Sequence, residues 1–117
     1  MRFSDWHDLD NTAGIPAETG LFQVRVKRAL LAYPGGKTAM YYYGYAADLQ
    51  QGCRQFIHEI LPKLDITADG LLLRTMVTDD VAHKFQQLLQ KFSLQFGALP
   101  HGNTAWLAIL QQTRSIG

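Results

Sequence analysis

The sequence has little cysteine and no excess of either charge. Its single cysteine, Cys53, excludes an internal disulfide and a zinc site built from several cysteines. Lys and Arg number 11 against 10 for Asp and Glu, so the formal charge of +1 offers no long-range attraction to nucleic acid or an anionic membrane. A nucleic-acid-binding function would therefore need a local basic patch.

Long apolar runs are also missing. No segment approaches the roughly 20 apolar residues that a membrane-spanning helix needs. The opening residues 1–8 include acids and lack the apolar stretch of a secretory signal peptide. From these absences we expect a cytoplasmic location and no membrane partner.

The chain has the length and apolar content of one globular domain. Its 117 residues are 47% hydrophobic, and no linker or repeat divides them. We expect a single domain over residues 1–117. It should consist of an N-terminal arm at 1–19, a core at 20–103 and a C-terminal helix at 104–117.

Alternation of apolar and polar residues predicts the strands. In the segment 20–26, Phe22 and its alternate neighbours face the core while the residues between them face away. Residues 29–33 should extend this strand, and Pro34–Lys37 should form a turn into an antiparallel partner at 40–46. A third strand is predicted at 71–77.

Helical periodicity follows each of the later strands. Asp48 should cap a helix that Pro62 ends, Thr78 or Asp79 should cap a second helix that ends at Gly97, and Asn103 should cap a short third helix. The predicted fold is α+β, a small antiparallel three-stranded sheet flanked by helices in the order β-β-α-β-α-α.

Short motifs on these elements resemble the GIY-YIG nuclease domain. The first strand opens with Gly20-Leu21-Phe22, and the second contains Tyr42-Tyr43-Gly44. After the second helix, Pro100 and then Asn103 follow as in the closing pattern of that family. The resemblance covers residues 13–103. It implies a GIY-YIG-like fold and, in an intact member, metal-dependent hydrolysis of DNA phosphodiesters.

The resemblance also marks where the catalytic residues should lie. Phe22 replaces the first-motif tyrosine, whereas Tyr42 keeps the second and could act as a base. The family's arginine falls on Gly52, and its metal-binding glutamate falls on Gln86, whose neutral amide is a poor ligand for Mg²⁺. Three of the four positions are chemically unsuited to hydrolysis, so we expect a non-catalytic domain without a metal or other cofactor.

A divergent nuclease is the alternative. Helical geometry puts Arg54 roughly 200° from Gly52, on another face of the first helix, which makes it a poor substitute. Glu59 is the one carboxylate near the end of that helix. An active enzyme would use Tyr42 as base, Arg25 or Arg54 as the cation, and Mg²⁺ held by Glu59 or another acid.

The partner of a non-catalytic domain could be nucleic acid or protein. Arg25, Lys27, Tyr43 and Arg54 are the candidate nucleic-acid-binding residues, with tyrosine side chains of the second strand exposed for stacking on bases. A solvated sheet face is the simpler interpretation of the same pattern. Tyrosine and tryptophan are also enriched at protein interfaces, so a small protein-interaction module of unknown role remains open.

The acidic N-terminal segment superficially suggests a cation site. Asp5, His7, Asp8 and Asp10 fall within six residues, but the segment lacks the glycine and the closing glutamate of a calcium loop. We expect a solvated acidic arm and no metal site.

Overall fold

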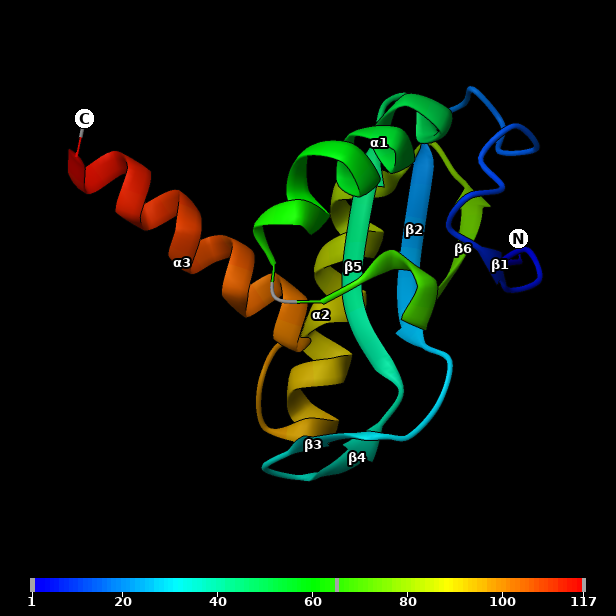
Figure 1. Cartoon of the computed structure of the whole chain (residues 1–117). Helices are drawn as coiled ribbons and strands as arrows, with labels where there is room; N and C mark the ends of the chain where they lie inside the picture. Colours follow the sequence, from blue (N-terminus) through cyan, green and yellow to red (C-terminus); the bar gives the residue numbers. More distant parts are fainter. Residues whose placement is uncertain (1, 65, 117) are drawn as a thin grey trace.

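The computed structural model describes residues 2–64 and 66–116, with side chains up to residue 112, and its centre is an antiparallel sheet (Figure 1). The described strands of this sheet follow the order β1-β6-β2-β5. Their bounds are His7–Asp8 for β1, Gly20–Val26 for β2, Met40–Ala46 for β5 and Leu71–Val77 for β6. The α+β class is confirmed, but the sheet has four strands where three were predicted. The additional strand is β1, whose two residues are too few to show any alternation.

A separate two-stranded ribbon interrupts the predicted hairpin. Strand β2 ends at Val26, and β3 (Leu31–Tyr33) pairs with β4 (Gly36–Thr38) around the predicted turn. The extension of the first strand through 29–33 is therefore wrong. Ala29 adopts a positive φ of 65°, which turns the chain out of β2 before the ribbon begins.

Helices cover both faces of the sheet (Figure 1). Helix α1 (Leu49–Gln55) continues without a break into a π-helical turn, η1 (Phe56–Ile60), and a 3₁₀ turn, η2 (Leu61–Lys63). Another 3₁₀ turn, η3 (Ala68–Gly70), leads into β6. Helix α2 (Val81–Phe96) lies on the opposite face, and α3 (His101–Ile116) runs from the edge of β5 away from the sheet.

The core has one part on each side of the sheet. Phe22 and Val24 pack with Leu49 and Phe56 on the side of α1. On the other side, the apolar face of α2 packs against Tyr43 and the ribbon. The burial of alternate β2 residues is confirmed. The residues between them differ from expectation, because Gln23 is only 3% exposed.

The helix ends test the predicted caps. The Asp48 carboxylate accepts from the Gln51 N–H at 3.0 Å, and Gly97 ends α2 at a φ of 75°, so both signals are confirmed. The N-cap of α2 is Asp80, and α3 begins at His101, before Asn103. The last helix is thus longer than predicted, and Asn103 lies inside its first turn. Among the described helices, none is long and apolar enough to cross a bilayer.

Candidate functional site

A groove of about 1040 Å³ lies beside the outer edge of β5. Strand β5 forms its floor, and side chains from α1, η1, α2 and α3 form its walls. The floor comprises Tyr42, Tyr43, Gly44, Tyr45 and Ala46, and the wall residues that matter below are Gly52, Arg54, His58, Glu59, Phe85, Gln86, Asn103, Leu107 and Leu110. The groove is open to solvent and of the size of a ligand site.

The four positions that the GIY-YIG resemblance marks lie together in this groove. Phe22, Tyr42, Gly52 and Gln86 all line it, although they come from β2, β5, α1 and α2. The sequence separation between them is as large as 64 positions, so only the tertiary fold brings them together.

Tyr42 is the one catalytic candidate among the four. Its ring stacks on Phe22 at 6.0 Å and tilts against Phe56 at 4.5 Å, between ring centroids. Burial raises the pKa of its hydroxyl to about 12, and no described residue offers that hydroxyl a hydrogen bond or a positive charge that would lower it. At neutral pH the hydroxyl stays protonated, so it can donate a hydrogen bond but is a weak base.

Gly52 has no space for a side chain. A Cβ at this position would lie 2.4 Å from the Ala46 Cβ, well inside van der Waals contact. An arginine could not be accommodated here without moving β5. Gln86, on the facing wall, is exposed and brings a neutral amide. These two positions therefore provide neither a cation nor a carboxylate.

Polar side chains enter the groove at neighbouring positions. Arg54, His58 and Glu59 line it together with Tyr42. His58 and Glu59 lie in the π turn η1, where the Leu61 N–H bonds to the Phe56 carbonyl five residues back, and this wider turn sets the direction of the two side chains. Arg54 lines the groove, although it lies on a different face of α1 from Gly52, which packs against Ala46 of β5. The Arg54 Nε lies 3.5 Å from the Thr12 hydroxyl.

Asn103 lines the groove, and the prediction from sequence that it caps the third helix is wrong. Its amide oxygen accepts from the Tyr43 N–H and its amide nitrogen donates to the Tyr43 carbonyl, both at 2.9 Å. The side chain thus pairs with β5 as a neighbouring peptide group would. Gly102 makes this approach possible, since a Cβ there would lie 2.9 Å from the Tyr41 carbonyl oxygen. No local signal predicts a contact across 60 positions.

The predicted basic and aromatic surface does not form. Tyr41 and Tyr43 are buried at 8% and 7% exposure, and Tyr43 packs on Phe92. Only Tyr45, at 53%, keeps an exposed ring on β5, and it contacts Phe85. Burial raises the pKa of Tyr43 to about 12, against an opposing effect of Arg74. The idea that Tyr43 stacks on bases is therefore wrong, because its ring already lies in the core.

The cations predicted to bind nucleic acid are engaged by the N-terminal arm. The Arg25 guanidinium lies 5.5 Å from the Trp6 ring centre. Arg74 lies 4.4 Å from Trp6 and 4.6 Å from the ring of Phe3, and its Nε donates to the Gln23 amide oxygen at 2.8 Å. Burial lowers the pKa of Arg74, Tyr43 opposes this effect, and the charge of Arg25 adds to it.

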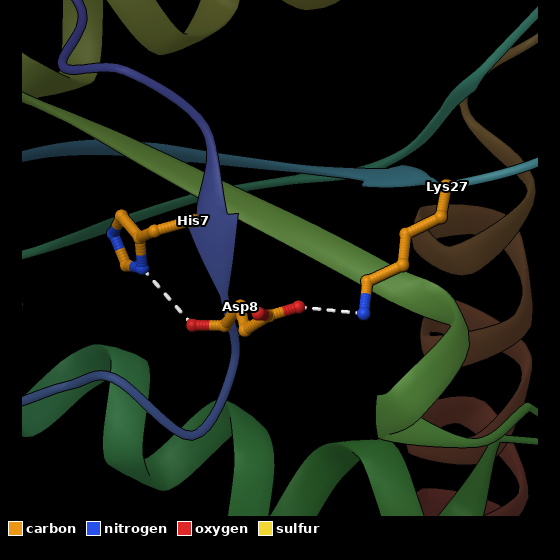
Figure 2. A network of polar contacts seen from close by, with 3 residues as sticks. All are labelled: His7, Asp8 and Lys27. Carbon is orange, nitrogen blue, oxygen red and sulfur yellow. Dashed lines mark hydrogen bonds and ion pairs between the residues drawn. The ribbon is translucent and has the colours of Figure 1, made fainter.

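Lys27, the next predicted cation, forms an ion pair with the arm. Lys27 Nζ lies 2.6 Å from the Asp8 carboxylate, and the His7 ring lies 3.0 Å from the Asp8 carbonyl oxygen. Figure 2 shows the two contacts side by side. Arg25 and Lys27 therefore lie at the arm, and Arg54 lines the groove while also contacting Thr12 of the arm. Tyr43 is buried in the core, so the four predicted nucleic-acid-binding residues do not form one exposed surface.

The acidic arm and the cysteine are the remaining candidates from the sequence. No group of three or more His, Cys, Asp or Glu side chains is arranged to hold a metal ion in the described part of the chain. Cys53 is fully buried, and burial raises the pKa of its thiol to about 12, so the reactive thiolate is disfavoured.

Comparisons with known proteins add no relative. No protein-family model, curated protein or solved structure matches this chain. The GIY-YIG resemblance therefore depends on its short motifs alone, and any function must be argued from the groove.

Proposed function

We propose that this chain is a non-catalytic, GIY-YIG-like domain that binds a protein partner in the groove beside β5. The observation that supports this most is the meeting of Phe22, Tyr42, Gly52 and Gln86 on one concave surface without a catalytic cation or metal ligand among them. A fold can keep a concave binding surface after its catalytic residues have been replaced, and the side chains at the catalytic positions then lack the groups that the reaction needs.

The composition of the groove favours protein over nucleic acid. Tyr45, Leu107 and Leu110 are exposed by 53%, 48% and 38% and line the groove, which is a pattern typical of protein interfaces. The charged side chains in its lining are Asp48, Glu59 and Arg54, so carboxylates outnumber fixed cations. A phosphate backbone would meet a net negative charge there.

A divergent nuclease is the second candidate. It is supported by the presence of Arg54, His58 and Glu59 in the same groove as Tyr42, which provides a cation and a carboxylate from positions that the family does not use. In that case Glu59 would hold Mg²⁺, and the metal would activate water.

A cleavage assay separates the two candidates. The purified domain is incubated with Mg²⁺ or Mn²⁺ and with single-stranded, duplex or branched DNA. We expect no cutting, and binding by fluorescence anisotropy that stays weak and disappears with added salt. Metal-dependent cutting that is lost in both Tyr42→Phe and Glu59→Gln, and kept in the exposed control Glu18→Gln, would establish the nuclease instead.

A binding selection tests the protein-partner proposal directly. Random linear peptides displayed on phage are selected on the wild-type domain and counter-selected on Leu107→Lys, which puts a charge on the apolar groove wall. We expect peptides that bind the wild type and the exposed control Leu94→Lys, and that lose at least about tenfold in affinity on Leu107→Lys. If no peptide distinguishes wild type from Leu107→Lys, the protein-partner proposal is wrong.

A further inference from the structure

The outer edge of β5 is only partly covered. Asn103 pairs with the main chain of Tyr43 at 2.9 Å, so Tyr43 directs its N–H and C=O outward, away from Gln23 on β2. Alternation along an antiparallel ladder then directs the main-chain groups of Tyr45 outward as well. The ladder is regular at this point, because the bulge lies farther along, opposite Val24 and Arg25.

The Tyr45 main chain has no partner in the described structure. No described residue hydrogen-bonds to its N–H or its C=O, and Tyr45 lies on the floor of the groove. An unpaired N–H and C=O beside each other on a strand edge form a template for one more strand. Asn103 demonstrates that this edge accepts a peptide-like group in that geometry.

We infer that the groove binds an extended peptide segment of another protein, which adds as a strand to β5 and pairs with the main chain of Tyr45. This inference depends on the proposed function and specifies the ligand and its binding mode.

The groove walls select a single extended chain over a second folded copy. Phe85 and Gln86 from α2, Gln55 from α1 and Leu107 from α3 all line the space beside the edge. The edge strand of another folded sheet brings its own flanking helices and would collide with these walls. A lone extended segment needs only the spacing between neighbouring strands, about 4.8 Å.

The chemistry of the walls defines the peptide. The residue opposite Tyr45 places its side chain on the same face as the Tyr45 ring, near Phe85, where an apolar group fits. Glu59 has no ion-pair or hydrogen-bond partner among the described residues, so it favours a lysine or arginine in the peptide. We therefore expect an extended segment with an apolar anchor and a basic residue.

Main-chain pairing can be tested by removing one hydrogen at a time. The peptide selected on the wild-type domain is resynthesised with each amide N-methylated in turn, and binding is measured by calorimetry. A peptide paired as a strand loses about tenfold or more at the one amide facing the Tyr45 carbonyl and little at the neighbouring amides. A uniform response along the peptide would show binding without strand addition.

A second variant removes the donor on the domain. Tyr45→Pro eliminates the outward N–H, and proline is tolerated where that group faces solvent on an edge strand. We expect at least about tenfold weaker binding by Tyr45→Pro than by Tyr45→Thr, which keeps the N–H and loses the same ring. Equal binding by the two variants, with both folded by circular dichroism, would overturn the strand-addition inference. If Tyr45→Pro does not fold, the N-methyl series decides.

A charge reversal tests the peptide chemistry. Selection on Glu59→Lys should replace the basic residue by an acidic one at the same position of the peptide. If the selected peptides lose affinity for Leu107→Lys but bind Tyr45→Pro and Tyr45→Thr equally, the strand-addition inference is wrong and the proposed protein-binding function stands. Failure to select any peptide that depends on Leu107 would refute the proposed function as well.

Discussion

The two edges of the sheet differ in how fully their polar groups are used. At the β1 and β6 side, the arm engages Arg25, Arg74 and Lys27 through Trp6, Phe3 and Asp8. At the β5 side, Asn103 engages Tyr43, but the main chain of Tyr45 and the Glu59 carboxylate have no described partner. The cations of the first side are therefore already engaged, whereas the second side keeps main-chain and carboxylate groups available for binding. This contrast is the reason for placing function at the β5 edge.

Removing the Asn103 side chain should lower stability more than any other substitution considered below, because it leaves two main-chain groups of Tyr43 unpaired. Each unsatisfied buried group costs about 1–3 kcal/mol, and the open groove admits water, so we expect Asn103→Ala to lower the free energy of unfolding by about 3 kcal/mol. Urea denaturation followed by circular dichroism measures this change. Thr104→Ala, at the exposed next position, is the control and should stay within about 0.5 kcal/mol of wild type. An unchanged midpoint for Asn103→Ala would mean that α3 does not stabilise the edge.

Asn103 also illustrates where sequence reasoning succeeds and fails. Periodicity and capping identified the three principal strands and the helical segments that begin at Leu49 and Val81, because Asp48 and Gly97 act on backbone within a few residues. The same local rule assigned Asn103 to a cap, whereas its partner lies on β5. Local chemistry determines the elements, but contacts across the chain determine which polar groups remain available.

The face of β2 shows the same limit. Alternation placed Arg25 and Lys27 on a common exposed face, and it could not reveal that the arm folds back over them. It likewise could not distinguish Tyr43, which α2 buries, from Tyr45, which stays exposed. For the groove, the resemblance identified the four marked positions. It did not predict that His58 and Glu59 line the groove, because they lie in a π turn that the sequence pattern does not reveal.

Alkaline pH should destabilise the groove side through its buried tyrosines. Tyr42 and Tyr43 have folded pKa values of about 12, above the unfolded value of 10. The protonated forms are favoured in the folded state, so their stabilisation is complete below pH 10 and is lost as pH rises from 10 to 12. The full linkage amounts to about 3 kcal/mol per tyrosine, since each pKa unit corresponds to about 1.4 kcal/mol. Urea unfolding at pH 8 and pH 11 should show a smaller loss for Tyr42→Phe than for wild type. An equal loss would mean that this hydroxyl titrates normally.

Removing Trp6 should loosen the arm side by less. The Trp6 ring contacts both Arg25 and Arg74, and a cation-π contact at a partly exposed site contributes about 0.5–1 kcal/mol. We expect Trp6→Ala to lower the free energy of unfolding by about 1–2 kcal/mol. The control Trp6→Phe keeps an aromatic ring and should lose much less stability. Hydrogen exchange should quicken in β1 and the adjoining part of β6 while the Tyr43 amide stays protected. Faster exchange at Tyr43 would show that the two edges are coupled.

The ion pair between Asp8 and Lys27 should contribute least, despite its short distance of 2.6 Å. The two side chains are 58% and 33% exposed for Asp8 and Lys27, so water screens their attraction and ordering them costs side-chain entropy. A double-mutant cycle with Asp8→Asn and Lys27→Met should give a coupling of about 0.5 kcal/mol that shrinks in high salt. A coupling several times larger would mean that this pair holds the arm in place. In that case the arm side would depend on charge, and salt should expose Arg25 and Arg74 to polyanions. A small coupling leaves the aromatic contacts of Trp6 and Phe3 as the main attachment, and the cationic face then stays covered at any ionic strength.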